Sequence, residues 1–151
     1  MKYIKKKLSI ENISITDIAK RYGTPSYCYS YSRLKKNIIN FKKSFKSFTP
    51  LICFAVKSNT NLNLIREIKK FGFGADVVSI GEMMMALKAG INPNKIVFSG
   101  VGKTSNEISF AIDKKILLIN AESLSEIKEI NRIAKIKKKN KNWNKAQSKY
   151  W

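Results

Sequence analysis

Apolar residues follow two different periods along this chain, and the alternation between them outlines the expected fold. Compact apolar runs occur at 51–56, 75–78, 96–99 and 116–119, so a new run begins about every 20 to 25 residues. The segments between these runs carry apolar residues at helical spacing. Unbroken apolar strands that alternate with amphipathic helices are typical of parallel β/α units. The pattern therefore predicts an α/β protein with about four such units, which form either half of an eight-fold (β/α) barrel or a small doubly wound sheet.

Turn and cap residues set the expected boundaries of these elements. We expect helices at 16–21, 32–48, 62–71, 81–89, 105–113 and 123–137. The segment 26–31 (SYCYSY) alternates small or polar residues with tyrosine, which favours an exposed strand at the edge of a sheet. We divide the chain into an amino-terminal segment (1–31), a β/α region (32–136) and a basic tail (137–151). The tail has no apolar period and is expected to be disordered.

The chain is strongly basic, with 30 Lys and Arg against 10 Asp and Glu among 151 residues, a formal net charge of +20. The lysines are scattered and accompany many Ile and Asn residues, without the arginine-rich, aromatic-interleaved face of a nucleic-acid-binding protein. Compositional bias therefore explains the charge better than a nucleic-acid partner, although a non-catalytic basic binding protein is the alternative. The absence of any histidine argues against a zinc site. No apolar run is long enough to span a membrane or to form a secretory signal, so we expect a cytoplasmic protein.

Three charged residues lie where the expected strands end. Lys57 follows the strand at 51–56, and function in parallel α/β folds collects at the carboxyl ends of strands. A lysine there is either a nucleophile or a cation that reaches solvent. Asp76 interrupts an apolar strand, so its carboxylate has a partner, such as Lys57, or points into a cavity. Glu82 follows Ser79 by three residues, which is the spacing of a capping box and is compatible with a place in a pocket.

Two phosphate-binding motifs are incomplete in this sequence. The segment Gly102-Lys103-Thr104 ends like a P-loop, but Val97 occupies the position at which that motif requires a glycine. Gly72-Phe73-Gly74 begins like a dinucleotide fingerprint, but it precedes a strand instead of following one. We interpret Thr104 with Glu107 as a capping box at the start of the next helix.

Four segments, taken in order, resemble successive motifs of one enzyme family. They are YGTPSYCYS (22–30), FAVKSN (54–59), GADVVSIGEM (74–83) and IVFSGVGKT (96–104). Together they resemble the fold-type III pyridoxal-phosphate-dependent decarboxylases, whose barrel is of the alanine racemase type, and within these the diaminopimelate decarboxylase family. The resemblance covers about residues 15–135.

The resemblance implies a fold, a cofactor and a reaction. It implies that 32–136 form the first half of a (β/α)8 barrel and that the strand at 26–31 belongs to a β domain. Lys57 matches the lysine to which pyridoxal 5'-phosphate is covalently attached, and Asp76 and Glu82 match acids that line the cofactor pocket. The family is homodimeric and decarboxylates a small amino acid, meso-2,6-diaminopimelate, to L-lysine. Relatives of the same fold act on ornithine, arginine or carboxynorspermidine, and each of these is an alternative substrate for this protein.

Several groups of the family's site are missing from these residues. The histidine that stacks on the cofactor ring, the glycine-rich phosphate loop and the acid at the pyridine nitrogen all belong to later sequence in the family. This chain contains no histidine at all. We therefore expect an amino-terminal fragment of the enzyme that is inactive alone.

Overall fold

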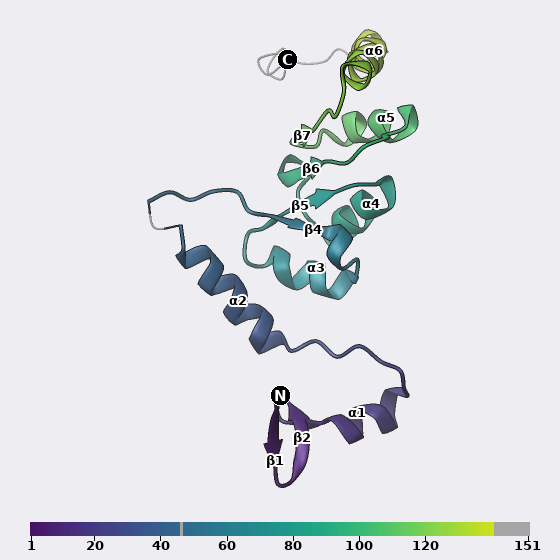
Figure 1. The fold of residues 1–151 in the computed structure, drawn as a ribbon. Helices are drawn as coiled ribbons and strands as arrows, with labels where there is room; N and C mark the ends of the chain where they lie inside the picture. Colours follow the sequence, from purple (N-terminus) through teal and green to yellow (C-terminus); the bar gives the residue numbers. More distant parts are fainter. Residues whose placement is uncertain (46, 141–151) are drawn as a thin grey trace. The chain divides into compact units, whose positions relative to one another are not determined.

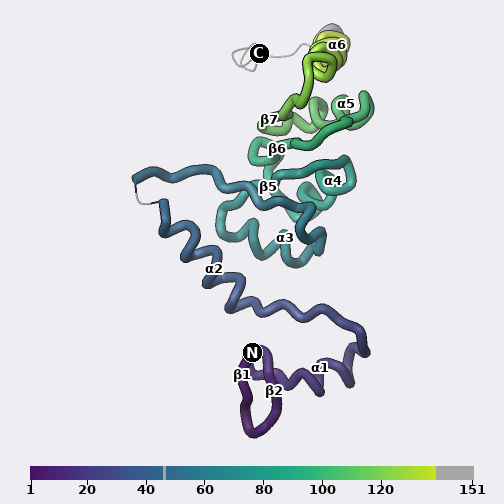
Figure 2. Tube along the Cα trace, in the orientation of Figure 1, coloured from purple at the N-terminus to yellow at the C-terminus, as the bar shows by residue number. Residues whose placement is uncertain are grey.

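The computed structural model describes residues 1–45 and 47–140, and Figures 1 and 2 show the path of the chain. The chain divides into two compact units, Met1–Thr49 and Pro50–Trp151, which are described separately. In the described part of the chain, no helix has both the length and the apolar character needed to cross a bilayer.

The first unit begins with a small antiparallel sheet that the sequence pattern did not predict. Its three strands are β1 (Lys2–Ile4), β2 (Lys7–Ile10) and β3 (Ile13–Ser14), paired in the order β1-β2-β3. The first hairpin turns at Lys5 and Lys6, which both have positive φ values of 47° and 66°. Two-residue turns of this kind match the twist of the strands, but they usually contain Asn or Gly. With lysines at both turn positions, the sequence carries no local signal for this hairpin.

Two helices complete the first unit, α1 (Ile15–Tyr22) and α2 (Tyr31–Lys43). The prediction of a strand at 26–31 is wrong, because residues 26–30 form no strand and Tyr31 already starts α2. Ser30 caps this helix by accepting a hydrogen bond from the Arg33 amide at 3.1 Å, and it donates one to the Glu11 carboxylate at 2.7 Å. Local capping therefore prevails over the alternation of tyrosines.

The second unit consists of parallel β/α units, as the apolar pattern predicted. The elements are β4 (Cys53–Ala55), the 3-10 turn η1 (Val56–Ser58), α3 (Leu62–Lys69), β5 (Gly74–Val77), α4 (Ile80–Lys88), the 3-10 turn η2 (Pro93–Lys95), β6 (Ile96–Phe98), α5 (Ser105–Lys114), β7 (Leu118–Ile119) and α6 (Leu124–Asn140). The four strands lie in sequence order, β4-β5-β6-β7, and each pair is parallel. The α/β prediction with about four units is confirmed. Helix α6 continues three residues beyond its expected end at 137, so the prediction of a disordered tail is wrong for residues 137–140, and residues 141–151 lie outside the described residues.

The two faces of this sheet differ in what covers them. Alternate strand residues pack against helices α3 to α6 in one apolar core. Its fully buried members from the strands are Ala75, Val77, Ile96 and Phe98, and those from the helices include Ile65, Met83, Ala86, Ile108 and Ala111. Because side chains alternate along a strand, Cys53, Asp76 and Val97 lie on the opposite face. The apolar core therefore fixes the strands, and the Asp76 carboxylate lies on the face away from that core.

Candidate functional site

The carboxyl ends of the four parallel strands meet along one edge of the second unit. In the register of the sheet, Ala55 of β4 lies beside Asp76 of β5, and Asp76 lies beside Val97 of β6. Lys57 therefore follows, by two residues, the strand position next to Asp76. The pattern of strands and helices predicted that functional side chains lie at this edge.

Lys57 lies in a turn whose main chain is held by hydrogen bonds, and the side-chain amine of Lys57 is free. Within η1, the Ser58 hydroxyl donates to the Ala55 carbonyl at 2.7 Å, and the Asn59 amide donates to the Val56 carbonyl at 2.9 Å. The Val56 side chain is completely buried in the core, whereas Lys57 is exposed. Among the described residues, none forms a hydrogen bond or an ion pair with the Lys57 amine. The amine is thus anchored by its backbone and remains accessible for chemistry.

Asp76 has a partner, but that partner is a serine. The Ser99 hydroxyl, one residue past β6, donates to Asp76 Oδ1 at 2.7 Å. The side-chain amide of Asn120, one residue past β7, donates to the same hydroxyl oxygen at 3.0 Å. The suggested Asp76–Lys57 ion pair is not present. Ser99 and Asn120 were not among the predicted site residues, although each directly follows an apolar strand.

Asp76 also affects a cysteine on its side of the sheet. Partial burial, and then the negative charge of Asp76, raise the pKa of the Cys53 thiol above its usual value. Burial disfavours the charged thiolate, and a nearby carboxylate disfavours it further. The Cys53 thiol therefore reports on the charge at Asp76.

Glu82 caps helix α4. Its carboxylate accepts a hydrogen bond from the Val78 amide at 3.0 Å, and the Ser79 hydroxyl accepts one from the Glu82 amide at 3.2 Å. The expected cap at Ser79 and Glu82 is therefore present, with the reciprocal bond one residue earlier than in the usual capping box. One carboxylate oxygen of Glu82 is thereby occupied by the main chain.

Glu107 connects the starts of two helices. The capping box of Thr104 and Glu107 is present at the start of α5, as predicted. The Glu107 carboxylate also accepts a hydrogen bond from the Ile80 amide of α4 at 3.0 Å. The hydrogen bond from the Thr104 amide, followed by that from Ile80, lowers the pKa of Glu107 below its usual value. These bonds fix the relative position of the two helix starts.

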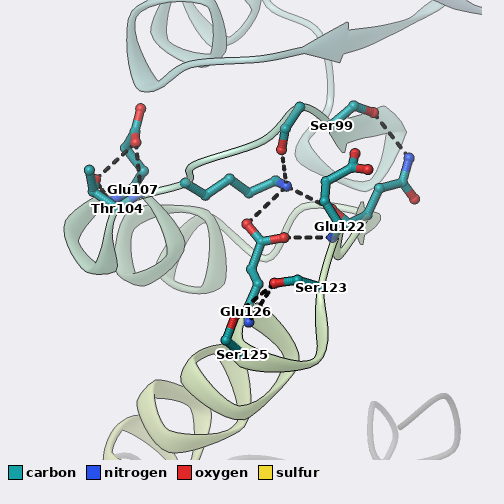
Figure 3. A network of polar contacts seen from close by, with 10 residues as sticks. Ser99, Thr104, Glu107, Glu122, Ser123, Ser125 and Glu126 are labelled. Carbon is teal, nitrogen blue, oxygen red and sulfur yellow. Dashed lines mark hydrogen bonds and ion pairs between the residues drawn. The ribbon is translucent and has the colours of Figure 1, made fainter.

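Lys103, at the end of the P-loop-like segment, is a buried structural residue. Its amine donates to the carbonyls of Gly100 at 2.5 Å and Asn120 at 2.7 Å, and it pairs with the Glu126 carboxylate at 3.2 Å (Figure 3). The Lys103 side chain is only 1% exposed and that of Glu126 only 9%. Gly100 and Gly102 have φ values of 92° and 73°, a region that favours glycine. The two glycines therefore let the main chain turn so that its carbonyl groups face the Lys103 amine. In a P-loop, the main chain surrounds a phosphate instead.

A pocket of about 380 Å³ lies beside this buried pair. It is lined by Val101, Gly102, Lys103, Ile108, Glu122, Ser123, Ser125, Glu126 and Glu129. None of the three predicted site residues, Lys57, Asp76 and Glu82, contributes to its walls. Among the described residues, no group of three metal-ligating side chains comes together.

Comparison with known proteins identifies the family. Residues 31–146 match the family model described as "Pyridoxal-dependent decarboxylase, pyridoxal binding domain". The chain belongs to the pyridoxal-dependent decarboxylases. It is 48% identical over 118 residues to a diaminopimelate decarboxylase of Helicobacter pylori and 43% identical over 134 residues to that of Aquifex aeolicus.

Solved structures support the same relationship. The structure of diaminopimelate decarboxylase from M. jannaschii in complex with L-lysine superposes with a TM-score of 0.86 at 33% identity, over 91% of this chain. This decarboxylase homologue thus has the fold of the amino-terminal, pyridoxal-binding part of those enzymes. The chain spans only 33% of that structure. The alignment with the Helicobacter relative includes 78% of this chain and 29% of the relative, and the alignment with the Aquifex relative includes 89% of this chain and 31% of the relative.

Proposed function

We propose that this decarboxylase homologue binds pyridoxal phosphate covalently through Lys57, as part of the active site of a diaminopimelate decarboxylase. The observation that supports the proposal most strongly is the free amine of Lys57 at the carboxyl edge of the sheet, within a chain that matches the pyridoxal-binding family model. The cofactor, when bound, accepts the electron pair that remains on the amino acid after carbon dioxide leaves.

The residues at this edge fit such a cofactor. Covalent attachment would replace the carbon–oxygen double bond of the cofactor's aldehyde by a carbon–nitrogen double bond to a primary amine, and the aldehyde oxygen would leave as water with the two protons of the amine. Lys57 supplies an amine that makes no ion pair with the described residues, so no partner has to be displaced before it reacts. Asp76 supplies a carboxylate on the polar face of the sheet, and its Oδ2 accepts no hydrogen bond from the described residues. We propose that Asp76 lines the cofactor site and that Glu82 shapes its border through the start of α4.

The proposed substrate is meso-2,6-diaminopimelate, and the proposed products are L-lysine and carbon dioxide. This choice is supported by the relatives' identity as diaminopimelate decarboxylases and by L-lysine in the complex from M. jannaschii. Because the chain spans about a third of these relatives, the whole reaction and the homodimeric assembly of the family are both part of the proposal. We expect the 151 residues alone to attach the cofactor without releasing carbon dioxide, since they contain no histidine to stack on its ring.

Titration with pyridoxal phosphate tests the first part of the proposal. The purified chain is expected to develop the near-ultraviolet absorbance of lysine-bound cofactor. Lys57→Ala is expected to lose this band, while Lys88→Ala, which removes an exposed lysine in the last turn of α4, keeps it. A band of equal size in the Lys57→Ala variant would contradict the proposal.

A complementation assay tests the substrate. The chain is co-expressed with the segment of the Helicobacter pylori relative that follows the matched region, and carbon dioxide release is measured with diaminopimelate, ornithine and arginine. We expect release from diaminopimelate alone, and only with Lys57 intact. Faster release from ornithine or arginine would overturn the substrate assignment and leave the lysine assignment in place.

A further inference from the structure

A line of side-chain hydrogen bonds crosses the carboxyl ends of three neighbouring strands. It runs from Asn120 after β7, through Ser99 after β6, to Asp76 in β5, with donor–acceptor distances of 3.0 and 2.7 Å. The main chain brings these residues together, because the Ser99 amide donates to the Val77 carbonyl at 2.8 Å and the Asn120 amide to the Phe98 carbonyl at 2.9 Å. The parallel ladder therefore continues one residue past each strand and aligns the three side chains.

Hydrogen-bond chemistry fixes the direction of this line. The amide nitrogen of Asn120 only donates, so the Ser99 oxygen acts as its acceptor. A serine hydroxyl has one proton, and it donates that proton to Asp76 Oδ1, because a carboxylate oxygen acts as the acceptor. The other carboxylate oxygen, Oδ2, accepts nothing from the described residues. One oxygen of Asp76 is thus held in place while the second stays available.

The buried lysine fixes the other end of the line. Lys103 donates to the carbonyl of Asn120 and to that of Gly100, which directly follows Ser99 (Figure 3). Its amine therefore ties together the main chain at both ends of the Asn120–Ser99 hydrogen bond. Glu126 of α6 neutralises the amine in this buried position, where an unpaired charge is costly.

We propose that Ser99 is a positioning residue, which orients the Asp76 carboxylate at the cofactor site and is itself held by Asn120 and Lys103. The inference rests on the proposed function, because the orientation of Asp76 affects chemistry only if Lys57 carries the cofactor. Ser99 is assigned no contact with cofactor or substrate. Its effect passes through Asp76.

Carbon-13 NMR of the aspartate carboxyl groups tests the hydrogen bond without any cofactor. The chain has only three aspartates, Asp17, Asp76 and Asp113, and Asp76→Asn assigns the resonance in question. Ser99→Ala is expected to shift the Asp76 carboxyl resonance, and Asn120→Ala to shift it less. Ser109→Ala, which removes a half-buried serine hydroxyl from α5, is the matched control and leaves the resonance in place. An Asp76 resonance that does not respond to Ser99→Ala overturns the proposal.

The rate of cofactor attachment tests the positioning role. Pyridoxal phosphate is trapped on Lys57 by borohydride reduction at a series of times and quantified by peptide mass spectrometry. We expect Ser99→Ala to slow attachment about two- to tenfold, the range for loss of one hydrogen bond. Asp76→Asn combined with Ser99→Ala should be no slower than Asp76→Asn alone, because both substitutions remove one coupled interaction. Ser109→Ala should attach the cofactor at the unaltered rate.

The outcomes separate the two proposals. If the unaltered chain attaches no cofactor at Lys57, the proposed function fails. If it attaches cofactor normally and Ser99→Ala does so at the same rate, only the positioning role of Ser99 is overturned. Additive losses in the double variant also overturn that role, since Ser99 would then act independently of Asp76.

Discussion

Two lysines follow strands of the same parallel sheet, and their amines have opposite surroundings. Lys57, after β4, is exposed and makes no hydrogen bond or ion pair with the described residues. Lys103, after β6, is 1% exposed, donates to two carbonyls and pairs with Glu126. A strand-end position therefore does not by itself make a lysine reactive. What distinguishes the two is whether the surrounding chain supplies acceptors for the amine.

The largest expected effect comes from removing the buried amine. Lys103→Met keeps the length of the side chain but leaves the Glu126 carboxylate buried without its cation. We expect the free energy of unfolding to fall by about 3–5 kcal/mol, as for other broken buried pairs. Lys57→Met, the matched change at the exposed lysine, should alter it by no more than about 0.5 kcal/mol. Urea unfolding followed by circular dichroism measures both.

A double variant shows whether the loss of stability comes from the buried Glu126 carboxylate that has no cation beside it. Adding Glu126→Gln to Lys103→Met should recover part of the lost stability, because no unpaired charge then remains. Equal stabilities of Lys103→Met and Lys57→Met would contradict the contrast between the two lysines.

The helix caps that follow the two lysines should have similar, intermediate effects. Asn61 accepts hydrogen bonds from the Asn63 and Leu64 amides at the start of α3, and Thr104 accepts one from the Glu107 amide at the start of α5. Asn61→Ala and Thr104→Ala should each cost about 1 kcal/mol of unfolding free energy in the same urea assay. Asn61→Ser and Thr104→Ser should restore most of it. A much larger loss at either cap would show that the two loops differ in more than their lysine amines.

A smaller effect is expected at the thiol of Cys53, on the polar face near Asp76. Burial and the Asp76 charge raise the pKa of this thiol, and alkylation requires the thiolate. In a Cys28→Ser background, the pH midpoint of alkylation should lie above the usual value for a cysteine. Asp76→Asn should lower this midpoint without returning it to the usual value, since burial remains. An unchanged midpoint in Asp76→Asn would place the carboxylate away from the thiol.

The smallest effect is expected at an accessible ion pair on α6, the helix that carries Glu126. Hydrogen bonds from Arg132, and then from Ser105, lower the pKa of Glu129 to about 2. Because the pKa is lower in the folded chain, the ionised Glu129 stabilises the fold at any pH above the ordinary carboxyl pKa of 4.5. This contribution is lost as the pH falls toward 2. At neutral pH, Glu129→Gln should lower the urea midpoint only slightly, because solvent screens exposed pairs and reduces what this ion pair contributes. NMR titration checks the pKa, and a midpoint loss comparable to that of Lys103→Met would contradict this ranking.

The fold of the second unit could be predicted because its apolar periods are strong and regular. The first unit was harder, since β1 and β2 are only three and four residues long, and turns at Lys5-Lys6 and at 11–12 lack the glycine that marks hairpins. The division at 31 and 32, and the assignment of the first segment to a β domain, stay predictions.

The candidate site was predictable in part. Lys57, Asp76 and Glu82 lie at the carboxyl edge that the alternation of strands and helices indicated. Ser99 and Asn120 were missed because serine and asparagine are ordinary turn residues, and only the register of three strands brings them to Asp76. The burial of Lys103 depends on Glu126, 23 residues away, which no local pattern reveals.

Site-resolved trapping of the cofactor tests the central claim most directly. The chain is incubated with limiting pyridoxal phosphate, reduced with borohydride, digested and analysed by mass spectrometry, so that every labelled lysine is identified. We predict that the label concentrates on Lys57 and is lost in Lys57→Arg, with none on Lys103. A label spread over the exposed lysines, and equal in the Lys57→Arg variant, would contradict it.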